Sequence, residues 1–128
     1  MGDINYASEK FGSAVRILAT SRDAIHERVK AARIEFGPVT EEDLPPDAIE
    51  DFQAFKSRFQ ALETEMAHVV EALEDQIRAG HEQDTDLAAN AINKWYPLAG
   101  LICDIDCAIT HAIFHALEHG EPRGPRRA

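Results

Sequence analysis

One long stretch of the chain repeats its apolar residues at alternating intervals of three and four positions. These residues are Phe52, Phe55, Phe59, Leu62, Met66, Val69 and Leu73, and the stripe is widened by Val70 and Ile77. The spacing is the a/d pattern of a heptad repeat, which places a continuous apolar stripe along one α-helix. Because neighbouring helices must cover such a stripe, the pattern predicts a helical bundle with mostly antiparallel packing at shallow angles.

Helical spacings also occur on both sides of this stretch. Two helices are expected before it, with apolar stripes from Ile4 to Leu18 and from Ile25 to Phe36. Gly80 is expected to end the long helix in the left-handed conformation. A short fourth helix follows, Pro97 kinks or breaks it, and a last helix runs from Leu98 to Leu117. No segment alternates with a period of two, so the predicted fold class is all-α, with four to five helices.

The length and the ends of the chain bound the domain organisation and the compartment. A chain of 128 residues can form one domain with its own core, so residues 1–120 are predicted to form a single helical bundle. Residues 121–128, rich in Pro, Gly and Arg, are predicted to form a flexible basic tail. The N-terminus lacks the pattern of a secretion signal, and the longest low-charge run contains Asp104 and Asp106. A cytoplasmic protein without a membrane span is expected.

The formal net charge of −10 is concentrated in the second part of the chain. Residues 41–118 hold 17 acidic and 4 basic residues. A field of this sign repels phosphates, so direct binding of nucleic acid is not expected, whereas a basic protein partner is favoured. The candidate contacts for such a partner lie in the loop before the long helix and on the outward side of that helix: Glu41, Glu42, Asp43, Glu71, Glu74 and Asp75.

A string of cysteines and histidines runs along the last helix at strict four-residue intervals: Cys103, Cys107, His111, His115 and His119. Each of these side chains can ligate a metal ion, but residues four apart drift by about 40° around a helix, so only neighbours can share one ion. The alternative hypothesis is therefore a metal-binding bundle that uses Cys107, His111 and His115: one neighbouring pair, Cys107/His111 or His111/His115, supplies two ligands to zinc or another transition metal, and another helix or subunit supplies the rest. The main interpretation involves no cofactor, and these residues then fill partly buried and terminal positions.

The last helix is apolar on two sides. Leu98, Ile102 and Ile105 belong to one stripe, and the opposite side carries Cys103, Cys107, Thr110 and Phe114. Apolar patches of this size rarely stay exposed, so the second side is covered either within the bundle or by another subunit. We expect a homodimer with Cys103, Cys107, Thr110 and Phe114 in the contact.

No motif in the sequence predicts catalysis. The chain has no Gly-rich phosphate loop and no Cys-x-x-Cys pair, and the neighbours Cys107 and His111 lack a third group that would orient them. The sequence therefore favours a non-enzymatic protein-interaction module. Short acidic proteins of this kind include inhibitors, antitoxins and accessory subunits of phage-defence or counter-defence systems, which is an analogy of fold class only.

The first fifty residues carry a resemblance to a known family. The shared residues are Tyr6-Ala7-Ser8-Glu9-Lys10, Ala19-Thr20, Asp23, Arg28, Pro38, Glu42-Asp43-Leu44-Pro45 and Asp51-Phe52. Over about residues 6–52, the chain resembles the opening of a family of short bacterial helical proteins of uncharacterised function. The resemblance implies a bacterial, cytoplasmic protein with a helical opening, and it implies no activity, substrate or cofactor.

Overall fold

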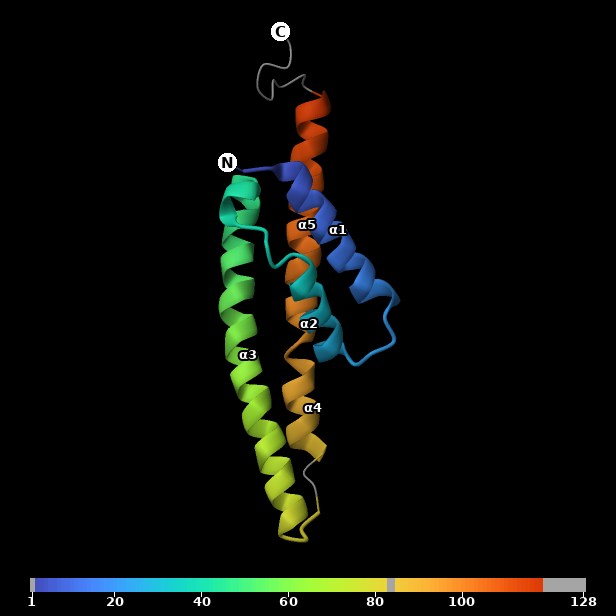
Figure 1. The fold of residues 1–128 in the computed structure, drawn as a ribbon, viewed down its shortest axis with the longest axis vertical. Helices are drawn as coiled ribbons and strands as arrows, with labels where there is room; N and C mark the ends of the chain where they lie inside the picture. Colours follow the sequence, from blue (N-terminus) through green and yellow to red (C-terminus); the bar gives the residue numbers. More distant parts are fainter. Residues whose placement is uncertain (1, 83–84, 119–128) are drawn as a thin grey trace.

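The computed structural model describes residues 2–82 and 85–118, and these residues form an all-α bundle, as predicted. The elements in chain order are α1 (Ile4–Thr20), α2 (Ile25–Glu35), the 3-10 turn η1 (Glu41–Asp43), α3 (Pro46–Arg78), α4 (Thr85–Asn93) and α5 (Tyr96–Glu118). In Figure 1, α4 and α5 follow one another beside the long helix α3, and α1 and α2 pack near α5. The chain reverses direction from α1 to α2, from α2 to α3, and from α3 to α4, and α5 continues in the direction of α4. This is the antiparallel arrangement expected for short connections.

Local sequence signals account for the helix ends. The carboxylate of Asp3 caps α1 by accepting hydrogen bonds from the backbone N–H groups of Asn5 at 3.0 Å and Tyr6 at 3.2 Å. Pro46 begins α3, where its missing N–H has no helical partner to lose. After α3, Gly80 has a φ of 75°, as its position in the sequence predicted. Pro97 lies in the first turn of α5, so the break between the last two helices falls where it was expected.

Aromatic rings connect the helices through the middle of the bundle. The rings of Phe11 in α1 and Phe36 after α2 stack with centroids 4.3 Å apart, and Phe36 meets Phe55 of α3 at 5.4 Å. From there the series continues through Phe59, which lies 5.6 Å from Phe55 and 5.6 Å from Trp95. Since Trp95 lies in the turn between α4 and α5 and is fully buried, this core fixes the break between these two helices against α3.

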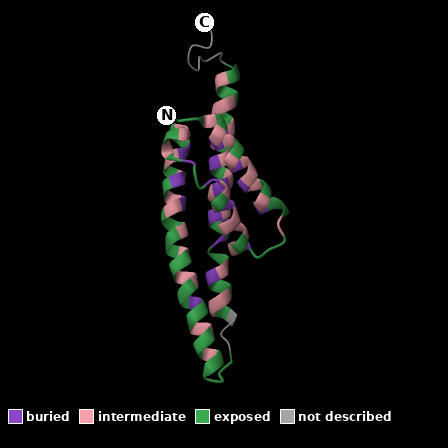
Figure 2. Cartoon of the chain, viewed as in Figure 1, coloured by how far each residue is buried: buried purple, intermediate pink, exposed green. Residues whose placement is uncertain are grey.

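The two halves of α3 are covered to different extents. We call residues 66–82 and 85–93 the distal hairpin, which consists of the second half of α3 and of α4. The helices α1 and α2 do not extend along it, and its surface is mostly exposed (Figures 1 and 2). Phe52 and Phe55 in the first half of α3 are buried, whereas Val70 is 47% and Ile77 59% exposed. The apolar side of α3 is therefore covered more fully in its first half than in its second, where Val69 is its one buried residue.

Candidate interaction surface

The inner side of α5 is a central part of the core. Leu98, Ile102, Ile105 and Ile109 are all buried, and α5 packs against α1 and α3 and, more lightly, against α2. These residues recur at spacings of three and four, so they form one stripe on the helix. On this side, α5 is the central helix of the bundle, which was one of the two arrangements that the sequence allowed.

The outer side of α5 is only partly covered by the described residues. Its positions continue the heptad spacing over the whole helix, and we call them the α5 outer seam: Tyr96, Gly100, Cys103, Cys107, Thr110, Phe114 and Leu117. The seam lies about 150° around the helix from the buried stripe. Phe114 is 60% and Leu117 63% exposed, while Cys103 and Thr110 are half-buried. A heptad stripe of this length is typical of a helix that packs against another helix.

The sequence identified the centre of this seam and missed its ends. Cys103, Cys107, Thr110 and Phe114 were predicted as contact residues, and all four lie on the outer side. Tyr96, Gly100 and Leu117 extend the same spacing by about one turn in each direction. The signal for these three residues is present in the sequence as the same alternation of three and four positions.

The surroundings of Cys103 do not favour nucleophilic chemistry at its thiol. Burial raises the pKa of the Cys103 thiol above its ordinary value, and the neighbouring Cys107 and Asp106 raise it further. A thiol with a raised pKa stays protonated at neutral pH and is a poor nucleophile. Burial also raises the pKa of Asp106, which lies partly buried on the flank of α5. Both pKa values are raised, which is the effect that burial has on a thiol or a carboxyl group.

The structure does not assemble the proposed metal site. The rings of His111 and His115 are neighbours, with centroids 6.4 Å apart, and Cys107 is exposed. Across the residues that the structure describes, no three His, Cys, Asp or Glu side chains gather closely enough to hold a metal ion. His119, the last member of the string, lies outside the described residues. His111 and His115 border a shallow hollow of about 420 Å³ beside Asp47, which adds one carboxylate.

The acidic residues of the loop have structural contacts of their own. Glu41 accepts a hydrogen bond from Lys56 at 2.7 Å, and this contact lowers the pKa of the Glu41 carboxyl. The two oxygens of Asp43 accept the backbone N–H groups of Asp3 and Thr40, each at 2.9 Å. The hydrogen bond from Thr40 is the main cause of the lowered pKa of Asp43. Two of the three predicted loop contacts therefore stabilise the start of the chain and η1, while Glu42 is exposed beside them.

The other predicted acidic contacts lie at the opposite end of α3. Glu71, Glu74 and Asp75 are exposed on the distal hairpin, where Asp75 pairs with Arg78. The distance along α3 from its first turn to Glu74 is about 42 Å at 1.5 Å per residue. The loop and the distal hairpin consequently cannot form one acidic surface, and only the residues of the distal hairpin remain available as a continuous acidic contact.

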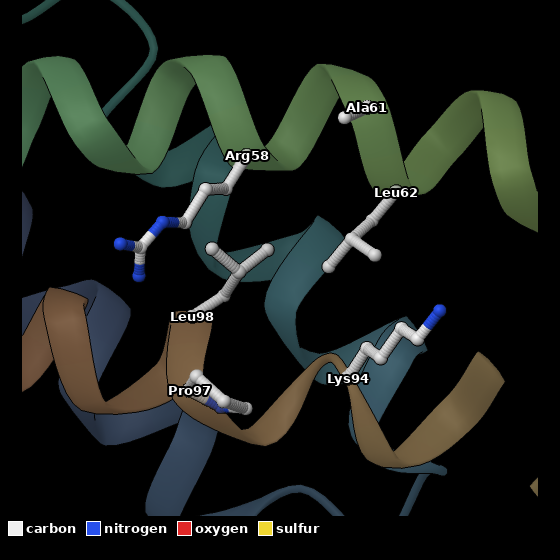
Figure 3. A pocket seen from close by; sticks show the side chains of 6 residues that line it. All are labelled: Arg58, Ala61, Leu62, Lys94, Pro97 and Leu98. Atoms are coloured by element: carbon white, nitrogen blue, oxygen red, sulfur yellow. The ribbon is translucent and has the colours of Figure 1, made fainter. Parts of the chain in front are cut away.

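A shallow hollow lies between α3 and the start of α5, and Figure 3 shows its lining. The lining residues are Arg58, Ala61, Leu62, Lys94, Pro97 and Leu98, around a volume of about 280 Å³. The amino group of Lys94 points away from Leu98 (Figure 3) and donates to Glu65 at 2.8 Å. The hollow is therefore an apolar depression bordered by two cationic residues, Arg58 and Lys94, of which Lys94 is paired with Glu65. Its lining contains no carboxylate.

Comparisons with known proteins do not place the chain in a family. No protein-family model, no curated protein and no solved structure matches it. The resemblance over residues 6–52 therefore stays a prediction.

The segment Asp86–Glu118 is long and apolar enough to cross a membrane, by length and composition alone. The core helix of a water-soluble protein passes the same test, and α5 is buried along its inner side, although only 22% of the tested window is buried. Cytoplasmic location therefore also stays a prediction.

Proposed function

We propose that the protein is a non-enzymatic protein-interaction module whose subunits associate through the α5 outer seam. The observation that carries this proposal is the uncovered heptad repeat from Tyr96 to Leu117 on a helix whose other side is already buried. Water does not favour an exposed apolar stripe of six turns, and a second copy supplies a matching stripe without any further component. A homodimer formed by one self-complementary face is also the commonest symmetric assembly.

The sizes of the seam residues favour an antiparallel pairing of the two α5 helices. In one register, Gly100 lies opposite Leu117 of the other copy, and Cys103 lies opposite Phe114. The small Cys107 and Thr110 then meet at the centre. Each layer combines a small residue with a large one or two of medium size, which is how closely packed layers interdigitate. A parallel pairing would set glycine against glycine at one end and phenylalanine against phenylalanine at the other.

Replacing Phe114 tests the dimer. Sedimentation equilibrium of the wild-type chain, of 14.2 kDa, is expected to give twice this mass. The Phe114→Lys variant is expected to be monomeric, because a charge placed within an apolar contact costs about 2 kcal/mol or more. Ile34→Lys is the matched control, since Ile34 is an aliphatic residue of α2 that is 75% exposed and lies away from the seam. A wild-type monomer at every concentration, or equal effects of the two variants, would contradict the proposal.

The register can be tested with engineered thiols. In a chain whose two natural cysteines are replaced by serine, Gly100→Cys alone is expected to give no cross-link with a short bis-maleimide. The two copies of position 100 would lie about 25 Å apart along the antiparallel pair. A mixture of Gly100→Cys and Leu117→Cys chains is expected to form a mixed dimer. Cross-linking of Gly100→Cys to itself would instead indicate a parallel pairing.

The distal hairpin supports the second half of the proposal, a basic protein partner. Residues 66–82 and 85–93 contain 5 acidic residues and 1 basic residue, Arg78, so the distal hairpin has a formal charge of −4. Charge of one sign at one end of a molecule steers an oppositely charged partner toward that end. Binding of such a partner is expected to weaken steeply as salt is added.

A further inference from the structure

An apolar groove runs along the distal hairpin, beyond the point where α2 begins. Met66, Val69, Val70 and Leu73 of α3 and Ala88 and Ile92 of α4 line it, together with His26, Glu27 and Lys30 of α2. The groove has a volume of about 340 Å³. It is separate from the α5 outer seam, because none of the seam residues lines it.

The groove occupies the place where a further helix would complete the bundle. In the other half of the molecule, α3 and α5 are accompanied by α1 and α2, but α2 extends only from Ile25 to Glu35 (Figure 1). Beyond Ile25, the first residue of α2, α3 and α4 lie side by side, and no third helix of the described part of the chain accompanies them (Figure 1). Val70 and Ile77 remain exposed there and are seven residues apart, which is one heptad. An added helix on the line of α2 would cover both of them.

The charges around the groove indicate which residues the added helix would carry on either side of its apolar face. Glu63 and Glu74 lie seven residues before and four residues after Val70 and therefore share its side of α3. On α2, the cation Lys30 already lies 3.8 Å from the carboxylate of Glu27. Glu27 and Lys30 balance each other in the lining, so Glu63 and Glu74, with the formal charge of −4 over residues 66–82 and 85–93, leave an excess of acidic residues beside the apolar floor. Lys or Arg beside an apolar stripe complements both features.

We infer that the groove binds an amphipathic helix of a partner protein, apolar on the face that enters it and rich in Lys or Arg at its edges. This inference rests on the proposed role in protein interaction, but it does not depend on the dimer. The apolar face of the partner would bury Val70, Leu73 and Ile77, and its basic residues would reach Glu63 and Glu74.

A synthetic peptide of about 18 residues, five helical turns, tests the inference. The peptide carries Leu at helical spacings on one face and Lys elsewhere, and a second peptide has Glu in place of Lys. Fluorescence anisotropy with the full-length chain is expected to detect binding of the Lys peptide only, and added salt is expected to weaken it. The Val70→Glu/Ile77→Glu double variant is expected to weaken binding by about tenfold or more, although it adds negative charge.

This design separates the groove from nonspecific attraction. If the Lys peptide bound only to the negative surface, the double variant would bind it equally well or more tightly, and that result would overturn the inference. Ile34→Glu, an exposed position in α2, is the control and is expected to change the affinity little. The monomeric variant Phe114→Lys is expected to bind the peptide as the wild type does, so failure of the dimer would not affect the result. No binding of the Lys peptide, equal binding of the Glu peptide, or a change in oligomeric mass caused by the double variant would also overturn the inference.

Discussion

The two halves of α3 carry one continuous heptad pattern but have different surroundings. In the first half, Phe52 and Phe55 are buried by rings and aliphatic side chains from α1, α2 and α5. In the second half, only Val69 is buried, and α4 is the one helix packed along it among the described residues. An apolar stripe thus predicts which side of a helix must be buried by another element. It does not specify that the same chain supplies the cover over the full length.

The α5 helix shows the same contrast across its width. Its inner stripe is buried within the chain, whereas its outer seam is left open with the same spacing of three and four residues. An uncovered stripe on a folded domain is a candidate contact for another chain. Among the described residues, the outer seam of α5 and the groove of the distal hairpin are two places where exposed apolar residues follow a helical spacing.

The largest expected loss of stability comes from removing an aromatic ring from the core. Phe36→Ala is expected to reduce the free energy of unfolding by about 3–5 kcal/mol, because Phe36 is fully buried and contacts the rings of Phe11, Phe52 and Phe55. Leu73→Ala in the distal hairpin is expected to cost clearly less, since Leu73 is half-buried. Urea denaturation of both variants measures the difference. Equal losses would mean that the distal hairpin is as tightly packed as the first half.

Hydrogen exchange sharpens the comparison without a mutation. Amides of α3 near Phe55 are expected to exchange only through global unfolding, whereas those near Ile77 are expected to open locally at a lower free energy. The reason is that fewer apolar contacts hold the second half of α3 in place. Native-state exchange followed by NMR measures both values. Equal protection along the whole helix would contradict the division into two regions.

A smaller and opposite pair of effects is expected from Asp43 and Asp106. The pKa of Asp43 is lowered from its ordinary value of 3.8, so its hydrogen bonds stabilise the fold above that value and are lost as the pH falls through the folded-state pKa. Asp43→Ala is expected to cost about 1 kcal/mol at neutral pH and nothing in strong acid. The raised pKa of Asp106 has the reverse sign, because burial of its charge destabilises the fold at neutral pH.

Asp106→Asn is therefore expected to raise the free energy of unfolding at neutral pH, and the gain is expected to disappear as the pH falls below 3.8, the ordinary value for this carboxyl. Urea denaturation at a series of pH values measures both variants. If the stability of Asp106→Asn followed that of the wild type at every pH, the carboxylate would have to be fully hydrated in solution.

The sequence was sufficient for the fold class and for several local features. The stripe from Phe52 to Leu73 predicted the long helix, and Gly80 and Pro97 predicted its end and the later helix break. Each of these signals acts within a few residues, so it can be read without knowing the tertiary structure. The inner stripe of α5 was predicted for the same reason.

The exposure of Val70 and Ile77 could not be predicted in this way. Both residues extend the stripe, and their cover depends on how far α2 reaches along α3, which is a property of the whole bundle. The same limit applies to the acidic residues. Glu41 and Asp43 have the composition of a binding surface, but the fold engages them with Lys56, Asp3 and Thr40.

Thiol cross-linking at Cys107 tests most directly whether the outer seam of α5 is a contact between subunits. In a Cys103→Ser variant, Cys107 is the only cysteine of the chain, and it is exposed. At low protein concentration, a short bis-maleimide is expected to convert the protein into a covalent dimer of twice 14.2 kDa. A single cysteine at Ile34, in a chain without the natural cysteines, is expected to stay monomeric under the same conditions. Monomeric product from the Cys107 chain, or equal dimer from both chains, would contradict the interface.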